Sequence, residues 1–267
     1  MYNSDIINMI ATRISDYSDT PVLDARFFCS YYNGNPTSLQ ISDFICRRKQ
    51  GEPVSKILGQ RGFWKRDFIV SKDVLDPRPD SETLIEAVLK YYTDKKQKLS
   101  ILDIGTGSGC LLLTLLDEYP NAQGLGIDKS KEALKIARQN DVSCRAEFKM
   151  DDFTDSCFGQ DYAKFDIIVS NPPYIKTDDI ALLDIAVRQF DPLSALDGGV
   201  DGLDAYRYLS KTLPLLLKDD GMIFFEIGQG QERDVIDLME TNHEFICAEQ
   251  IKDLSGIIRI LAFRKTK

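Results

Sequence analysis

Apolar residues recur with two different periods along the chain, and the change of period divides it into parts. Isoleucines recur at helical spacing over residues 6–14, Thr20 and Pro21 supply a cap and a first-turn proline, and Thr37 opens a segment that ends at Gly51. This pattern predicts a small helical domain at residues 1–60.

Two short runs rich in aromatic and branched residues follow, at residues 62–64 and 67–70. Runs of this composition on either side of a short turn predict a β-hairpin. We expect it to form a hinge over residues 61–82, with the boundary between the domains near residues 71–82.

From residue 99, runs of strand length alternate with helical patterns. We expect strands at residues 99–104, 125–128, 148–150, 165–170 and 222–227. We expect helices at residues 110–116 and 131–138. Such alternation predicts an α/β fold with a mainly parallel sheet covered on both faces. Two last runs, at residues 245–250 and 257–263, predict a hairpin that adds an antiparallel C-terminal edge. The expected sheet thus has seven strands, in a domain at residues 83–267.

The charge balance bears on the choice of partner. The 267 residues include 33 Lys and Arg against 42 Asp and Glu, a formal net charge of -9. Proteins that clamp duplex nucleic acid usually carry a basic surface, although a local basic patch can lie on an acidic protein. We therefore expect no direct nucleic-acid partner.

Cysteine and histidine usage bears on metal binding. The six cysteines form no Cys-x-x-Cys pair and His243 is the only histidine, so the spacing of a zinc site is missing. We expect reduced, mostly buried thiols and no metal. Residues 1–5 lack the basic start of a signal peptide, and no run reaches the roughly 18 apolar residues of a membrane span. We expect a cytoplasmic monomer with no membrane partner.

A glycine-rich turn marks a candidate cofactor site. It follows the expected strand at residues 99–104 and precedes a helix, so that backbone amides can approach a ligand and a helix N-terminus can face negative charge. The Gly-x-Gly-x-Gly spacing departs from the Gly-x-Gly-x-x-Gly of dinucleotide sites, which favours S-adenosylmethionine over NAD. The candidate cofactor-binding residues are Gly105, Thr106, Gly107, Ser108 and Gly109.

The ends of the next two strands add polar candidates. Asp128 lies where sheets of this kind place a carboxylate for ribose hydroxyls; the alternative is a helix cap, for which Ser130 competes. Asp151, Asp152 and Phe153 could meet the adenine amino group and ring, or could simply begin an acidic loop.

Asn171-Pro172-Pro173-Tyr174 ends the apolar run at residues 165–170. An amide or aniline-type nitrogen is a poor nucleophile because its lone pair is delocalised, so acceptors must favour a pyramidal nitrogen. Asn171 can supply its side-chain carbonyl and Pro172 its backbone carbonyl, the prolines fix the backbone, and Tyr174 could stack on the planar group. We therefore predict Asn171, Pro172 and Tyr174 as catalytic and all four residues as substrate-binding. The alternative is a proline turn capped by asparagine.

With these motifs the chain resembles the HemK/PrmC family, the protein-(glutamine-N5) methyltransferases that modify the Gly-Gly-Gln glutamine of class I peptide chain release factors. Further matching stretches are residues 51–53, 63–64, 77–82 and 195–203. The resemblance implies a Rossmann-like class I S-adenosylmethionine-dependent methyltransferase fold, an N-terminal domain that recognises the substrate, and S-adenosylhomocysteine as the product.

The resemblance also implies roles for single residues. It places residues 105–109, Asp128 and Asp152 on S-adenosylmethionine, residues 171–174 on the substrate glutamine with Asn171 facing both ligands, and Arg78 and Glu82 at the rim. The chain departs from the family pattern at Asp76, where an aliphatic residue is expected, and at Asp152, where an aromatic one is common. Adenine stacking would then fall to Phe153 or another apolar side chain.

The connection that follows the tetrad is long and acidic. It contains Asp178, Asp179, Asp184 and Asp191, and long ordered loops tend to be functional. We expect an acidic substrate groove here that suits a basic release-factor loop. The alternative is a solvated surface stretch.

Three other functions fit parts of the pattern. A ribosomal-protein glutamine methyltransferase would share the core, and an adenine-N6 DNA methyltransferase would use the same tetrad on a flipped base. A noncatalytic adaptor could keep the fold. The residues at 77–82, the helical start and the net charge favour the release-factor enzyme.

Overall fold

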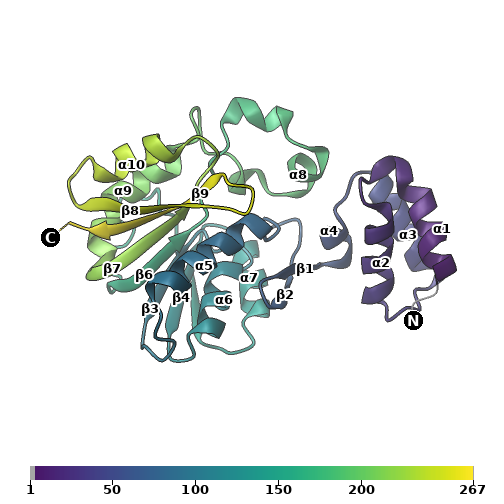
Figure 1. Cartoon of the computed structure of the whole chain (residues 1–267), viewed down its shortest axis with the longest axis horizontal. Helices are drawn as coiled ribbons and strands as arrows, with labels where there is room; N and C mark the ends of the chain where they lie inside the picture. The colour runs from purple at the N-terminus through teal and green to yellow at the C-terminus, as the bar shows by residue number, and fades with distance from the viewer. Residues whose placement is uncertain (1–3, 267) are drawn as a thin grey trace.

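The N-terminal region is a cluster of four helices, as the isoleucine spacing predicts. The computed structural model describes residues 4–266, and residues 1–3 and 267 lie outside the described part. Residues 1–3 begin both the expected domain at residues 1–60 and the stretch that lacks signal-peptide features. The rings of Phe28 and Phe44 stack 4.3 Å apart at the centre of the cluster, against Ile10 and Ile14. Figure 1 shows these helices to one side of the sheet. They are α1 (Ser4–Ile14), α2 (Pro21–Tyr31), α3 (Ser38–Lys49) and α4 (Val54–Leu58).

The caps of these helices match the sequence in one case and not in the other. Thr37 forms a capping box with Gln40 at the start of α3. Thr20 makes no cap with its side chain, although Pro21 is the first residue of α2. The Thr20 hydroxyl instead donates to Asp24, which is buried and paired with Arg48 at 2.9 Å. Thr20 therefore occupies the N-cap position, but the predicted side-chain cap is not formed.

The predicted seven-stranded sheet is present, with the order β5-β4-β3-β6-β7-β9-β8. The first five strands in this order pair in parallel, and β9 and β8 add the antiparallel edge. The chain therefore runs outward from β3 in one direction and then starts again at β6 in the other. The strands are β3 (Ser100–Ile104), β4 (Gln123–Asp128), β5 (Ala146–Met150), β6 (Phe165–Ser170), β7 (Leu217–Glu226), β8 (Phe245–Lys252) and β9 (Ile258–Lys265).

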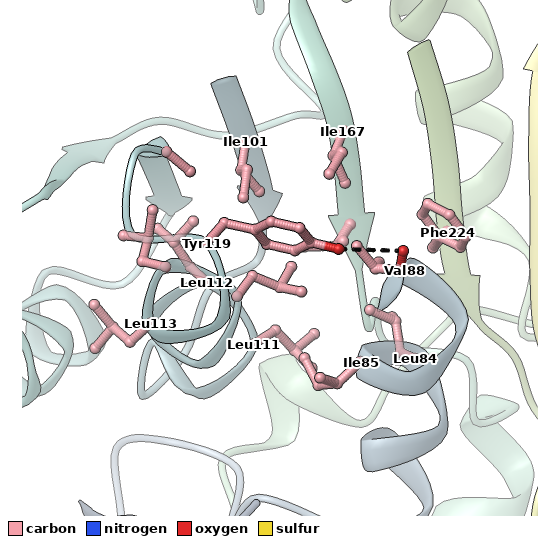
Figure 2. Close-up of a cluster of buried hydrophobic side chains, with 14 of the residues drawn as sticks. Leu84, Ile85, Val88, Ile101, Leu111, Leu112, Leu113, Tyr119, Ile167 and Phe224 are labelled. Atoms are coloured by element: carbon pink, nitrogen blue, oxygen red, sulfur yellow. Dashed lines mark hydrogen bonds between the residues drawn. The ribbon is translucent and has the colours of Figure 1, made fainter. Parts of the chain in front are cut away.

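Alternate residues of the central strands point into two separate cores. On β6, Ile167 and Val169 join one buried cluster while Ile168 joins the other, as the period of two in a strand requires. The first core lies under α5 (Glu82–Tyr91), α6 (Cys110–Glu118) and α7 (Lys131–Asn140); the second lies under α9 (Asp204–Leu216) and α10 (Glu232–Glu240). In Figure 2 the Tyr119 ring extends from the end of α6 toward Val88 of α5, beside Ile101 and Ile167 of the sheet.

Three of the covering helices were not expected from the sequence. In α10 the buried residues are only Val235 and Met239, four positions apart, whereas α5 buries five residues and α9 buries six. Pro214 stands in the last turn of α9. The narrow stripe of α10 gives a weak apolar signal, whereas the helical period of α5 and α9 is present in the sequence and was overlooked.

The predicted hairpin consists of β1 (Gln60–Phe63) and β2 (Arg66–Ile69), and it is fixed to the sheet domain. Phe63 and Phe68 are buried in the first core, and the amide of Ile69 donates to Asn140 Oδ1 at the end of α7. At the turn, the indole of Trp64 donates to Glu118 of α6 at 2.9 Å. These contacts place the hairpin with the sheet; the division at residues 60 and 82 stays a prediction.

Glu118 makes the hairpin contact sensitive to pH. Burial acts to raise its pKa, but hydrogen bonds from Lys65 and Trp64 and the charge of Lys95 outweigh burial and lower the pKa to about 2. A carboxyl whose pKa is lower in the folded than in the unfolded state stabilises the fold above its unfolded pKa, and this stability is lost as the pH falls. We expect the free energy of unfolding, measured in urea, to fall between pH 4.5 and 2 more steeply in the wild type than in Glu118→Gln.

The exposed Glu86 on α5 supplies the matched control for that measurement. Glu86→Gln is expected to keep the wild-type pH dependence. Equal slopes in the wild type and Glu118→Gln would show that the Glu118 contacts do not contribute.

A buried ionic cluster joins α4 to the segments around the sheet. The Lys56 ammonium lies 2.9 Å from Asp76 Oδ1 and 3.0 Å from Asp191 Oδ1, and all three side chains are buried. Arg78 donates to the other oxygen of Asp191 at 2.6 Å. Asp76, where the family pattern has an aliphatic residue, also accepts a hydrogen bond from Ser55. The aspartate that replaces the aliphatic residue of the family pattern is therefore paired with Lys56.

Removing the lysine from this cluster should be costly. Lys56→Met leaves the buried carboxylate of Asp76 without its cation, while Asp191 keeps Arg78, and breaking a buried pair in this way costs about 3–5 kcal/mol. Lys135→Met is the control because Lys135 is exposed and 3.5 Å from Glu132, and such pairs contribute at most about 1 kcal/mol. Urea unfolding of the two variants measures the difference. A cost for Lys56→Met no larger than that for Lys135→Met would contradict the account.

The cysteines of the chain carry free thiols. All six cysteines are free, but only Cys29 is buried, so the prediction of mostly buried thiols was wrong. Across residues 4–266 no helix combines the length and apolar character needed to cross a bilayer. The same residues contain no cluster of three His, Cys, Asp or Glu side chains arranged to hold a metal ion.

Candidate active site

A cavity lies at the carboxyl ends of the parallel strands, next to the point between β3 and β6 where the strand order reverses. Ligands of open α/β sheets bind at this place. The cavity encloses about 970 Å³ of empty space, part of it open to solvent. Its walls come from the turn after β3, the ends of β4, β5 and β6, and residues 73–81 and 192–195.

The glycine turn forms one wall and leaves room for a ligand. Gly105, Gly107 and Gly109 have φ values of 74°, 56° and 80°, which favour glycine. A Cβ atom on Gly105 would meet nothing within 4 Å, so this part of the wall is open. A Cβ on Gly109 would lie 3.1 Å from Leu113 and 3.4 Å from Ala137, and Gly109 does not line the cavity. The third glycine therefore allows α6 to pack.

The two hydroxyl residues of the turn both line the cavity. Thr106 donates to Asp103 Oδ2 at 2.7 Å, and Asp103 is buried. Among residues 4–266 the other carboxylate oxygen of Asp103 is one of three buried side-chain polar atoms without a hydrogen-bond partner. Burial raises the pKa of Asp103 to about 7. Asp103 was not among the predicted site residues.

Asp128 lines the cavity at the end of β4. Its carboxylate accepts from the amide of Gly107 at 2.9 Å and from that of Ser130 at 2.8 Å. Burial raises the pKa of Asp128, and these two hydrogen bonds oppose the rise. Ser130 caps α7 by accepting from the amide of Ala133. The capping role thus belongs to Ser130, whereas Asp128 holds the glycine turn and lines the cavity.

Of the three candidates after β5, two line the cavity. Asp151 and Phe153 do so, and Asp151 also accepts hydrogen bonds from the Tyr162 hydroxyl and the Asp152 amide. Asp152 lies outside the cavity wall, and its carboxylate accepts from the amide and the hydroxyl of Thr154. The structure thus brings Asp151, and not Asp152, to the site.

Asn171 and Pro173 line the cavity directly after β6, while Pro172 is buried behind them. Asn171 Nδ2 donates to the hydroxyl of Ser81 at 3.2 Å. No hydrogen bond from the rest of residues 4–266 reaches Asn171 Oδ1. An acceptor oxygen is therefore available on a residue that lines the same cavity as the glycine turn.

Tyr174 does not line the cavity, unlike the stacking role expected for it. Its ring packs against the second core, and its hydroxyl lies 3.2 Å from Glu226 Oε1. Burial and the charge of Glu226 raise the pKa of Tyr174. In this structure Tyr174 supports the tetrad from behind.

The backbone at residues 195–203 packs closely against the end of the tetrad, and this close packing requires its glycines. A Cβ atom on Gly198 would lie 2.8 Å from the backbone of Pro173 and Tyr174, and one on Gly202 would lie 2.4 Å from Tyr174 O. The amide of Ile175 donates to Leu196 O at 3.0 Å, and that of Gly198 returns to Ile175 O at 2.8 Å. Only glycine allows this approach, which fixes the backbone after Tyr174.

The long connection after the tetrad is folded and only partly acidic at its surface. It contains the helices η3 (Thr177–Leu182), α8 (Ile185–Phe190) and η4 (Leu193–Ala195). Asp178 and Asp179 are exposed, Asp184 caps α8, and Asp191 is buried in the cluster with Lys56. The expectation of four acidic groove residues was therefore wrong for Asp191. Pro192, Ser194 and Ala195 nevertheless complete the cavity wall.

The residues present fit a nucleoside-containing cofactor. The open space at Gly105, the carboxylate of Asp128, and Asp151 with Phe153 line one continuous cavity. Backbone amides, a carboxylate for ribose hydroxyls and an aromatic ring beside a second carboxylate are the groups that such a ligand requires.

Comparison with known proteins agrees with this geometry. A family of methyltransferase domains matches residues 94–255. A release factor glutamine methyltransferase of Rhodospirillum rubrum is 49% identical over 226 residues, which are 83% of this chain and 67% of that protein. The chain belongs to the release factor glutamine methyltransferase family. Another member, from Thermodesulfovibrio yellowstonii, is 37% identical over 250 residues, or 88% of this chain and 86% of that protein.

A solved structure of a protein with low sequence identity supports the fold. A ribosomal protein L11 methylase from Lactobacillus delbrueckii superposes with a TM-score of 0.51 at 18% identity, over 74% of this chain and 84% of that one. The methyltransferase family and this likeness confirm the predicted Rossmann-like class I architecture.

Sequence reasoning missed two residues of this methyltransferase: Ser81, which contacts Asn171, and Glu226, which contacts Ser81. Ser81 lies inside the family stretch at residues 77–82, and Glu226 ends β7. Arg78 reaches the cavity wall as expected, whereas Glu82 accepts from the Trp64 amide at 2.7 Å and fixes the hairpin. A lone carboxylate in the apolar run at residues 222–227 was the signal that could have identified Glu226.

Proposed function

We propose that this chain transfers a methyl group from S-adenosylmethionine to the side-chain amide nitrogen (N5) of the glutamine in the Gly-Gly-Gln motif of class I peptide chain release factors. The observation that carries the proposal is Asn171, whose amide nitrogen is held by Ser81 while its oxygen is free at the cavity. A primary amide can donate to such an oxygen, and glutamine is the residue named for the relatives.

The chain's own groups would hold the cofactor at the glycine turn. The backbone of the turn would approach it closely at the open space beside Gly105, the Asp128 carboxylate would accept from ribose hydroxyls, and Asp151 and Phe153 would face the adenine. When bound, S-adenosylmethionine supplies a methyl group on a positively charged sulfur that is a good leaving group.

Asn171 and Pro172 would prepare the glutamine nitrogen. Asn171 Oδ1 accepts one N–H of the substrate amide, and the carbonyl of Pro172 is the proposed second acceptor. Two acceptors favour a pyramidal nitrogen and orient its lone pair toward the methyl group, which supplies proximity and orientation. With the cofactor bound, the methyl group that it supplies would replace one amide proton of the glutamine, and that proton would leave the nitrogen for water. This chemistry requires neither a strong base nor a metal.

The proposal extends to partners and cellular role. The N-terminal helices would recognise the release factor, the protein would act as a monomer in the cytoplasm, and methylation would serve translation termination. The exposed Asp178 and Asp179 lie on the connection that completes the cavity wall, where they could meet a basic loop.

Transfer of labelled methyl from S-adenosylmethionine tests the proposal. The acceptors are a purified release factor, the same factor with its Gly-Gly-Gln glutamine replaced by alanine, a large-subunit ribosomal protein and unmethylated DNA. Label on the wild-type factor alone is expected. Label on the ribosomal protein or on DNA, and not on the factor, would overturn the proposed substrate.

A further inference from the structure

We propose that Ser81 and Glu226 are positioning residues that determine which end of the Asn171 amide faces the substrate glutamine. This inference rests on the proposed function of Asn171. Neither residue needs to touch the substrate, because both act through the Asn171 side chain.

The three residues form one hydrogen-bonded chain from three separate elements. Asn171 follows β6, Ser81 lies in the turn before α5, and Glu226 ends β7. Asn171 Nδ2 donates to Ser81 Oγ at 3.2 Å, and Ser81 Oγ donates to Glu226 Oε2. Ser81 and Glu226 are 3% and 1% exposed, so water cannot replace either partner.

The direction of these hydrogen bonds follows from the chemistry of a carboxylate. An ionised carboxylate only accepts, and a hydroxyl has a single proton to give. Ser81 must therefore donate to Glu226 and can only accept from Asn171, so the NH2 group of Asn171 faces Ser81. Asn171 Oδ1 is left for the cavity.

Three groups stabilise the ionised form of Glu226 against burial. Burial is the largest effect and leaves the pKa of Glu226 raised, while hydrogen bonds from Ser81 and Tyr174 and the charge of Arg259 limit the rise. The Arg259 guanidinium is held nearby by Ile227 O at 3.2 Å and Asp253 at 3.4 Å. The second oxygen of Glu226 lies 3.2 Å from the Tyr174 hydroxyl, so the same carboxylate also holds the last residue of the tetrad.

The inverse orientation of Asn171 would oppose the proposed reaction. An NH2 group turned to the cavity would face the NH2 group of the substrate glutamine, donor against donor, and would supply no acceptor. Glu226→Gln allows this inversion, because a glutamine amide can donate to Ser81 and free the serine proton for Asn171 Oδ1. Ser81→Ala removes the link altogether.

The test compares Ser81→Ala and Glu226→Gln with the rescue variant Ser81→Thr, which keeps the hydroxyl. The first two are expected to lower kcat for release-factor methylation by about 10- to 100-fold. The Kd for S-adenosylmethionine should stay near wild type, circular dichroism should show that both variants are folded, and Ser81→Thr should recover most of the activity. Ser210→Ala is the matched control, since Ser210 is a buried serine of α9 that donates to Arg207 O.

A second measurement does not depend on turnover. In protein labelled with 15N-asparagine, the side-chain NH2 signals of Asn171, assigned by their loss in Asn171→Ala, should shift in Ser81→Ala and Glu226→Gln and stay in place in Ser210→Ala. Wild-type kcat in Ser81→Ala and Glu226→Gln, or unmoved Asn171 signals, would overturn the inference. A wild-type protein that methylates no release factor would instead overturn the proposed function, and the NMR signals would then decide whether the chain Asn171–Ser81–Glu226 is formed.

Discussion

Asn171→Ala is expected to lower kcat for methyl transfer by about 100-fold or more, because it removes the side-chain acceptor that orients the substrate amide. The cofactor contacts of the glycine turn and Asp128 remain, so the Kd for S-adenosylmethionine should change by no more than a few fold. Steady-state kinetics with a purified release factor, together with calorimetric titration of the cofactor, separate the two effects.

Asn121→Ala is the matched control for that variant. Asn121 lies before β4, far along the strand from the cavity, and its amide donates to Lys96 O at 2.8 Å. We expect wild-type turnover from Asn121→Ala. If Asn171→Ala kept full turnover, Asn171 would not be the group that holds the glutamine.

Asp128→Ala is expected to weaken S-adenosylmethionine binding by about 10- to 100-fold, since a hydrogen bond to a charged group contributes about 1.5–3 kcal/mol. The variant removes the proposed ribose acceptor and also leaves the amides of Gly107 and Ser130 without their partner. Calorimetric titration measures the affinity, and circular dichroism confirms that the variant is folded.

Two neighbouring aspartates make this measurement selective. Asp155→Ala is the control, because Asp155 lies in an exposed turn and accepts from the amide of Cys157. Asp152→Ala separates the family resemblance, which assigns Asp152 to the cofactor, from the structure, which directs it to Thr154. We expect Asp152→Ala to bind S-adenosylmethionine like Asp155→Ala. A loss equal to that of Asp128→Ala would contradict the placement of Asp152.

The parts of the fold that the sequence predicted are those governed by local pattern. The short, nearly continuous apolar run at residues 165–170 predicts a parallel strand that is buried on both faces. In the structure its residues alternate between the two cores. The glycine turn was equally predictable, because Gly105 and Gly107 adopt backbone angles that disfavour other residues. The order of these two motifs was enough to place both at the same edge of the sheet.

The missed features depend on contacts between distant segments. Nothing local in Ser81 shows that Asn171 and Glu226, 90 and 145 residues away, will share its hydroxyl. The same holds for Asp191, whose burial depends on Lys56 of α4. Asp151 and Asp152 are adjacent and chemically identical, so only the direction of the backbone after β5 decides which one lines the cavity.

Mass spectrometry of a release factor incubated with the protein and S-adenosylmethionine tests the central claim most directly. The account predicts the added mass of one methyl group on the peptide that carries Gly-Gly-Gln, with fragment ions that place it on the side-chain nitrogen of the glutamine. An unmodified Gly-Gly-Gln peptide, or a methyl group on any other residue of the factor, would contradict the account.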